Sequence, residues 1–353
     1  MAAGRHDADI VIIGGGPAGS AAAITCAKRG LSVVVLERDQ VFGERPGETM
    51  HPGVRPILEQ LGLGNRIDAL ATGFHAGIWI EWGGPPRFQT FGSDADGPWQ
   101  GFHLWRPDFD GALLSLAGDF GVDVRRGVSV LGIAGEHGAI REIETEYGTM
   151  TARVVIDATG RVRHLARQLD ISYQPRSPRL IARYGYVTGS CPVRDDAPKI
   201  SGDMSGWTWT ARIRDGLYQW TRVDFNDVAK DDWLPEEFQG MAPLSRTRGA
   251  DVTWRIAERL AGPNWFMAGD AAATLDPTSS RGVLKSILTG VMSGHLADAA
   301  IGGKLTPQQA ASYYHQWLLE WFDKDVTHMK QFYRLLGHSE LGSLLWSPET
   351  GPL

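Results

Sequence analysis

The sequence predicts an α/β fold in which a Rossmann-type domain is interrupted by a mainly antiparallel β-sheet domain and followed by C-terminal helices. Three observations support this prediction. An apolar strand at residues 10–13 runs into a glycine-rich turn, strictly alternating strands dominate residues 180–253, and strand-then-helix sequence returns near residue 264. Buried parallel strands are apolar throughout, whereas strands with only one packed face alternate apolar and polar residues.

The first element is a strand, turn and helix with the spacing of a dinucleotide-binding motif. Gly14, Gly16 and Gly19 form a G-x-G-x-x-G pattern, and residues 18–29 are predicted to be helical. The first glycine makes a tight turn, the second lets the backbone approach a pyrophosphate, and the third lets the helix pack on the strand. The helix N-terminus adds unpaired N–H groups and a positive dipole end. A Val-rich strand then ends on Glu37, at the spacing of an acid that hydrogen-bonds a ribose hydroxyl.

Composition excludes several classes of protein. The 353 residues carry a formal net charge of -6 without a long basic run, which argues against a nucleic-acid partner. Cys26 and Cys191 lack metal or redox spacing, which fits a reducing compartment, and no His, Asp or Glu set has the spacing of a metal site. No apolar run reaches about 18 residues, so we expect no membrane span and a cytoplasmic location. The sequence does not indicate an oligomeric state.

The middle of the chain supplies a loop and the inserted sheet. Residues 38–53 are polar and rich in Gly and Pro, so they form a loop suited to cofactor contacts. Residues 74–91 and 181–225 alternate with period two, which predicts strands and hairpins around a cavity. We therefore expect these domain boundaries: 1–73, 100–175 and 256–300 for the nucleotide-binding domain, 74–99 and 176–255 for the substrate domain, and 301–353 for a C-terminal helical segment.

Aromatic residues are numerous, with thirteen tryptophans in the chain. Most are expected to fill the core, because aromatic side chains bury large areas. Trp207 and Trp209 are expected instead to line the substrate pocket. Tyr313, Trp317 and Trp321 recur every four residues in a predicted helix from 306 to 336, a pattern typical of packing.

Three motifs in order resemble FAD-dependent enzymes of the aromatic-hydroxylase type: the glycine turn, Asp157-Ala-Thr-Gly160 and Gly269-Asp270. The segments Gly206-Trp-Thr-Trp209 and Asp276-Pro277…Gly282-Val283 are more similar to flavin-dependent tryptophan halogenases. The resemblance implies bound FAD, with electrons from transient NAD(P)H or from a partner flavin reductase. The motifs and the resemblance together assign these residues to FAD: Gly14, Gly16, Pro17, Ala18, Gly19, Glu37, Arg38, Arg45, Thr49, Arg106, Asp157, Gly160, Gly269, Asp270, Pro277, Gly282 and Val283.

The expected chemistry depends on a departure from the halogenases. Their catalytic lysine is expected in the segment that reads Phe74-His-Ala-Gly-Ile78 here, and no lysine occurs between Lys28 and Lys199. The main expectation is therefore a monooxygenase in which C4a-hydroperoxyflavin hydroxylates an electron-rich ring. Glu48, His51 and His75 are candidate acid or base groups, although structural roles would explain Glu48 and His51 equally well.

The expected substrate comes from a further resemblance. The segments Pro46–Val54 and Asp276–Ser286 look like flavoproteins that assist the biogenesis of tryptophylquinone cofactors. This implies a tryptophan within a quinoenzyme precursor as substrate. Three alternatives remain. Two are enzymes that act on a small molecule: a flavin-dependent halogenase of an aromatic compound, and a geranylgeranyl-reductase-like dehydrogenase. The third is a non-catalytic, flavin-bound maturation chaperone.

Overall fold

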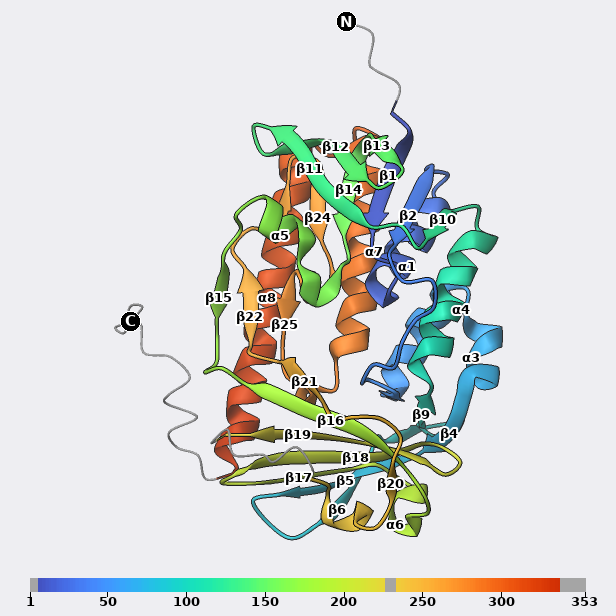
Figure 1. Cartoon of the computed structure of the whole chain (residues 1–353), viewed down its shortest axis with the longest axis vertical. Helices are drawn as coiled ribbons and strands as arrows, with labels where there is room; N and C mark the ends of the chain where they lie inside the picture. The colour runs from blue at the N-terminus through green and yellow to red at the C-terminus, as the bar shows by residue number, and fades with distance from the viewer. Residues whose placement is uncertain (1–5, 226–232, 337–353) are drawn as a thin grey trace, which may run out of the picture.

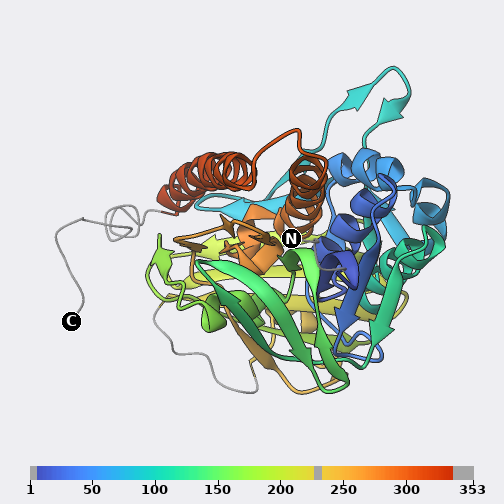
Figure 2. The ribbon, with the colours of Figure 1, turned by 90° about the horizontal axis from the view of Figure 1, so that it is seen from above.

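A computed structural model describes residues 6–225 and 233–336 and confirms the mixed α/β architecture. A parallel-sheet unit with flanking helices forms one half, and a large antiparallel sheet lies across the other (Figure 1). Two long C-terminal helices, α7 (Gly282–Ile301) and α8 (Pro307–Arg334), lie on the same side of the molecule (Figure 2).

The first sheet has six strands, of which the first five in the order below are parallel. Its central strands are apolar and buried, as expected of a parallel sheet covered on both faces. In spatial order the strands are β10 (Asp123–Arg126), β2 (Val33–Glu37), β1 (Ala8–Ile13), β14 (Ala152–Asp157), β24 (Trp265–Met267) and β23 (Ala261–Gly262).

Helix α1 (Pro17–Ala27) packs closely on α7, although 254 residues of chain lie between the end of α1 and the start of α7. Glycines permit the close approach. A Cβ added at Gly290 would lie 2.1 Å from the Ala18 carbonyl oxygen, and one at Gly294 would lie 3.0 Å from the Thr25 side chain. The last third of the described chain therefore completes the unit that the first residues begin.

The large sheet has eight strands, all antiparallel to their neighbours except the pair β17 and β5. Residues 77–90 pair directly with the sheet formed by residues 181–251, as β17 accepts β5 at its edge. In order the strands are β20 (Ala242–Pro243), β16 (Ile181–Thr188), β19 (Leu217–Asp224), β18 (Gly206–Arg214), β17 (Lys199–Asp203), β5 (Gly77–Trp82) and β6 (Arg87–Thr90), with β21 (Arg248–Asp251) also paired to β16.

Short elements connect the two halves. The smaller sheets comprise β11 (Val130–Glu136), β12 (Ala139–Thr145) and β13 (Gly148–Met150); β15 (Tyr173–Pro175), β22 (Arg255–Ala257) and β25 (Ala273–Thr274); β3 (Thr49–Met50), β9 (Gly101–Leu104) and β4 (Ala71–His75); and β7 (Ser93–Asp94) with β8 (Gly97–Pro98). The remaining helices are α2 (Arg55–Leu61), α3 (Gly64–Leu70), α4 (Arg106–Asp119), α5 (His164–Gln168) and α6 (Pro192–Asp195), with 3-10 turns η1 (Pro52–Val54), η2 (Gly160–Val162), η3 (Glu236–Phe238), η4 (Gly269–Ala271) and η5 (Pro277–Ser279).

The buried stripe of α8 differs from the predicted one. Tyr314, Leu318 and Phe322 are buried, whereas Tyr313 is 53% exposed. Trp317 and Trp321 of the predicted stripe are partly buried against the core, but the fully buried row lies one residue further on. The helix turns this row toward β24, where the Tyr314 hydroxyl donates to the Met267 carbonyl at 2.6 Å. Both rows have a spacing of four, so periodicity alone cannot choose between them.

Candidate cofactor and active site

A single large cavity of about 800 Å³ is lined by residues from both halves of the molecule. Its walls combine the β1–α1 turn, the loop at 44–51, the segment that leads into α7, and the inner face of the large sheet. The cavity collects every residue that the sequence analysis assigned to cofactor, catalysis or substrate except Gly19 and Asp157.

The glycine turn has the geometry of a phosphate cradle. Gly14 has a φ of +101°, and an added Cβ would lie 2.5 Å from the Ala158 carbonyl oxygen. A Cβ at Gly19 would lie 1.9 Å from the Gly14 carbonyl oxygen, so Gly19 lets helix and turn touch. A Cβ at Gly16 would meet no atom within 4 Å. This open side faces the cavity at the N-terminus of α1, as a bound pyrophosphate requires.

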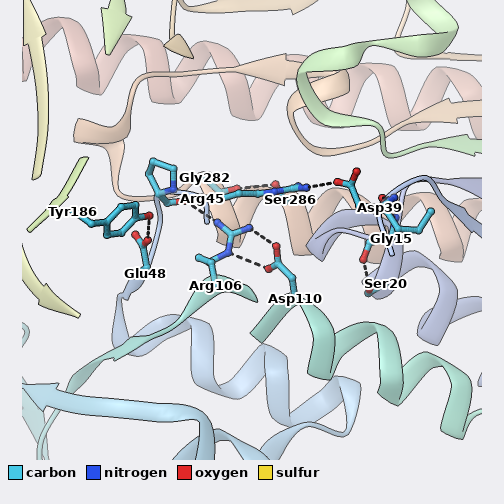
Figure 3. Close-up of polar contacts among 12 residues, drawn as sticks. Gly15, Ser20, Asp39, Arg45, Glu48, Arg106, Asp110, Tyr186, Gly282 and Ser286 are labelled. Atoms are coloured by element: carbon cyan, nitrogen blue, oxygen red, sulfur yellow. Dashed lines mark hydrogen bonds and ion pairs between the residues drawn. The ribbon is translucent and has the colours of Figure 1, made fainter. Parts of the chain in front are cut away.

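Glu37 is buried at the end of β2 and holds the turn as well as lining the cavity. Its carboxylate accepts the Gly15 N–H at 2.6 Å and the Asp39 N–H at 2.9 Å. Arg45 reaches back to Asp39 with an N–O separation of 3.2 Å (Figure 3). Arg38 Nε lies 3.5 Å from the same carboxylate. These contacts surround the cavity end where the ribose and adenine of a dinucleotide are expected.

Arg106 is buried at the start of α4 and fixes the loop at 44–51 (Figure 3). Its Nε and Nη2 each donate to one carboxylate oxygen of Asp110 at 3.0 Å, and its Nη1 donates to the Pro46 carbonyl at 2.8 Å. The guanidinium thus orders the loop from below while remaining part of the cavity wall.

The two later motifs differ in what they do. Asp157 lies beneath the cavity, where it accepts hydrogen bonds from the Thr159 N–H and hydroxyl and from the Leu165 N–H, so it shapes the turn that presents Gly160. Gly269 and Asp270 line the cavity itself. Asp270 is approached by Lys285 Nζ at 3.6 Å and by Arg161 Nε at 3.8 Å.

Helix α7 begins where a flavin ring would need a partner. Pro277, Gly282 and Val283 line the cavity, and a Cβ at Gly282 would meet no atom within 4 Å. A helix N-terminus offers N–H groups and a positive dipole end, which suit the carbonyl edge of an isoalloxazine. With the open glycine cradle at the other end, the lining residues fit an extended flavin dinucleotide.

Three histidines gather beside β4 and β9. His75 stacks on His103 with ring centroids 4.7 Å apart, and both His75 and His51 pack edge-on against Phe91. His75 Nδ1 lies 2.9 Å from the Gly77 carbonyl, which can only accept, so Nδ1 carries the proton. Its Nε2 is buried without a hydrogen-bond partner. Burial lowers the pKa of His75 and of His51, which keeps both rings neutral near pH 7.

Glu48 is a fully buried carboxyl group in the cavity wall. It accepts a hydrogen bond from the Tyr186 hydroxyl on β16 (Figure 3). Burial raises the pKa of Glu48 to about 7, although the Tyr186 hydrogen bond and the nearby Arg106 charge act in the opposite direction. At neutral pH this group can therefore hold or release a proton.

The floor of the cavity is the large sheet. Trp207 and Trp209 are two residues apart on β18 and so share the face that lines the cavity, together with Tyr184, Gln219 and Thr221. Tyr184 and Tyr186 were not predicted as site residues, although they are two residues apart on β16 and their period-two spacing indicates that they share one face of the strand. The roles of Asp276 and Tyr333, described below, were not predicted either, because no local pattern reveals them.

Several expected absences can be compared with the part of the chain that the structure describes. No lysine is among the residues that line the cavity there. Over residues 6–225 and 233–336, no group of His, Cys, Asp and Glu could hold a metal ion, and no helix is long and apolar enough to cross a membrane.

Comparisons with known proteins give two family matches. Residues 9–168 match the FAD dependent oxidoreductase family, and residues 96–321 match the tryptophan halogenase family. The solved structure of CmlS, a flavin-dependent halogenase, superposes with a TM-score of 0.84 over 97% of this chain and 68% of its own, at 23% identity.

Three relatives with named activities are each less than 30% identical to this chain. A tryptophan 2-halogenase from Chondromyces crocatus is 26% identical over 94% of this chain and 72% of its own. A brominase of 1H-pyrrole-2-carbonyl-[peptidyl-carrier protein] from Pseudoalteromonas luteoviolacea is 27% identical over 84% and 78%. A menaquinone reductase from Mycolicibacterium smegmatis is 25% identical over 82% and 76%.

These matches overturn the expected hydroxylation of a peptidyl tryptophan. The similar proteins include a tryptophan 2-halogenase, a brominase of a carrier-bound pyrrole and a flavin-dependent halogenase, so they support the halogenase alternative instead. The error came from weighting one missing lysine above the whole pattern of flavin and sheet motifs.

Proposed function

This chain belongs to the tryptophan halogenase family and is an FAD-dependent oxidoreductase, and on that premise we propose that it is a flavin-dependent halogenase of a small aromatic molecule. One observation carries the proposal: a single cavity joins the glycine cradle to an aromatic floor that contains Trp207 and Trp209. FAD, when bound, supplies the two-electron chemistry that activates dioxygen. The substrate ring would lie on the sheet face, because planar rings pack well against indoles.

The residues of this chain would bind the ring and take up its proton. Replacement of an aromatic hydrogen by halogen releases a proton, so a group able to accept it is needed nearby. Glu48 is suited to that role, because burial brings its pKa to about 7. His75 lines the same cavity as a neutral ring and belongs to the segment in which the sequence analysis expected the halogenase lysine. We propose Glu48 as the proton acceptor and His75 as a group that positions the substrate.

The electron supply is proposed to come from outside the chain. The sequence contains one glycine fingerprint, at Gly14 to Gly19, and we assign this turn to FAD. We therefore propose that a partner flavin reductase, or NAD(P)H bound only briefly, reduces the cofactor.

The test is a turnover experiment with the full chain. FAD, NADH, a flavin reductase, oxygen and either chloride or bromide are supplied with free tryptophan, indole or a carrier-bound pyrrole. The expected product carries one halogen, seen by the isotope pattern in mass spectrometry. Absence of any halogenated product while reduced FAD is consumed, or a product with added oxygen alone, would contradict the proposal. The Glu48→Gln variant should bind FAD but lose most of the turnover.

A second candidate is a flavin-dependent reductase of an apolar double bond. It is favoured by the menaquinone reductase relative and by the lack of a lysine among the described residues that line the cavity. Anaerobic mixing separates the two functions. A reductase would reoxidise its reduced FAD when a quinone or isoprenoid is added without oxygen, whereas a halogenase would not.

A further inference from the structure

Helix α8 runs alongside the loop that leads into α7, and three side chains of α8 contact that loop. Asp325 accepts from Arg281 Nη1 at 2.6 Å, Met329 Sδ lies 3.7 Å from the Thr278 hydroxyl, and the Tyr333 hydroxyl donates to Asp276 at 2.8 Å. The helix residues are spaced by four, so they form one row on one face. The loop partners occur in reverse order, so helix and loop run antiparallel over their whole contact.

The loop in question forms the flavin end of the cavity. Asp276, Pro277, Thr278, Ser280 and Gly282 all line it. The helix that holds this loop extends from the parallel-sheet unit to the ends of the large sheet (Figure 1). Helix α8 is therefore placed to set the position of the loop relative to both halves.

Asp276 is the centre of a buried hydrogen-bond network. Its carboxylate caps η5 by accepting the Thr278 N–H at 2.9 Å, and it also accepts the Trp254 indole N–H at 2.6 Å and the Tyr333 hydroxyl at 2.8 Å. The side chain is fully buried. Buried polar groups are costly to leave unpaired, so each donor that is removed weakens the position of the loop.

Tyr333 extends the network to the substrate floor. Its oxygen accepts the indole N–H of Trp207 at 2.8 Å while its own proton goes to Asp276. A single phenol thus touches the flavin loop on one side and the aromatic floor on the other. Trp207 and Tyr333 are 126 residues apart, and both are buried.

We infer that Tyr333 is a positioning residue that fixes the flavin loop and the aromatic floor at Trp207 relative to each other. The part of this inference that concerns substrate rests on the proposed function, whereas the part that concerns FAD does not. Loss of the hydroxyl would leave the Trp207 N–H buried without its acceptor and Asp276 without one donor. Both ends of the cavity should then lose order together.

The first test uses Tyr333→Phe with Tyr314→Phe as the matched control. Tyr314 lies on the same helix, is equally buried, and donates its hydroxyl to a backbone carbonyl away from this network. Tyr333→Phe loses two buried hydrogen bonds and Tyr314→Phe loses one, so both should lose thermal stability and Tyr333→Phe should lose more. Only Tyr333→Phe should weaken FAD binding to the apoprotein, by about fivefold, the effect expected for the loss of its one bond to the flavin loop, the bond to Asp276. Equal FAD affinity in the two variants would overturn the inference.

The second test follows the link to Trp207 with indole as the probe. Indole binding to the FAD-loaded protein is measured by the change in the visible flavin spectrum, without turnover. Tyr333→Phe and Trp207→Phe should each weaken indole binding, and the double variant should be no weaker than the worse single variant. Additive losses would show that the two residues act separately and would overturn the link. If wild type binds indole but makes no halogenated product, the proposed function fails while this inference stands.

Discussion

The Tyr186 hydroxyl donates its hydrogen bond to the buried carboxyl group of Glu48, so a strand of the large sheet holds the loop that lies along the cofactor cavity. The consequence is a measurable pH dependence. Burial raises the pKa of Glu48 from 4.5 to about 7 in the folded protein. Between these values the folded state binds more protons than the unfolded state, so the contribution to the free energy of unfolding falls as the pH rises.

The variant that isolates this effect is Glu48→Gln, which still accepts from Tyr186. As the pH rises from 4.5 to 7, wild type should lose about 1.4 kcal/mol of stability per pH unit relative to Glu48→Gln. Above pH 7 the difference in stability between the two proteins should be constant. Urea unfolding at pH 5.5 and 7.5 measures it. Parallel pH profiles would show that Glu48 does not titrate in this range.

His103 should give the opposite dependence. Burial, with the neighbouring His75 and Arg212, lowers the pKa of His103 from 6.5 to about 3. Below pH 6.5, His103 is therefore protonated in the unfolded chain but not in the folded protein, so the stability of the fold decreases as the pH falls. The stability deficit of His103→Gln relative to wild type should shrink by about 1.4 kcal/mol per pH unit from pH 6.5 downward. A deficit that does not change with pH would contradict this.

Gly16 and Gly19 should separate cofactor binding from folding. The Cβ of Gly16→Ala enters open space beside the cavity, and Gly16 has a φ of -67° that alanine tolerates. The apoprotein should unfold within about 0.5 kcal/mol of wild type, yet FAD affinity should fall by more than about tenfold.

Gly19→Ala is the comparison variant, because its Cβ would lie 1.9 Å from the Gly14 carbonyl oxygen. It should lose about 1–3 kcal/mol of stability as well as FAD affinity. Thermal unfolding and fluorescence titration with FAD measure the two quantities. If Gly16→Ala were as unstable as Gly19→Ala, the assignment of Gly16 to the pyrophosphate would be wrong.

The Arg106–Asp110 pair should show the cost of an unpaired buried charge. Asp110→Ala leaves the Arg106 guanidinium buried without its carboxylate, which should cost about 3–5 kcal/mol. The double variant Arg106→Met, Asp110→Leu removes both charges and should recover most of that loss. FAD affinity should stay low in the double variant, because the donor to the Pro46 carbonyl is also gone. Recovery of both properties would mean that Arg106 does not order the loop.

Sequence patterns were sufficient where structure is decided locally. The β1–α1 turn, the Glu37 strand end and the start of α7 follow from glycine positions and apolar runs, and the structure places them around one cavity. Period-two alternation likewise located β16, β18 and β19. In each case a few neighbouring residues carry the physical cause.

Other features depend on contacts between distant segments. The edge pairing of β17 with β5 and the Trp207–Tyr333 hydrogen bond join residues more than 100 positions apart. The buried row of α8 was displaced by one residue, because only the position of β24 decides which row faces inward. Asp157 was expected at the cofactor, but its side chain accepts hydrogen bonds from Thr159 and Leu165 and does not line the cavity.

The close packing of α1 on α7 has a consequence for synthesis of the chain. The cradle is encoded at residues 14–19, but the helix that packs against it ends only at Ile301. During translation the large sheet emerges before α7, so the first strand and helix must wait for their partner until most of the chain has been made. Firm retention of FAD by nascent or truncated chains should therefore begin only once α7 has left the ribosome, which makes the bound cofactor a marker that synthesis has passed Ile301.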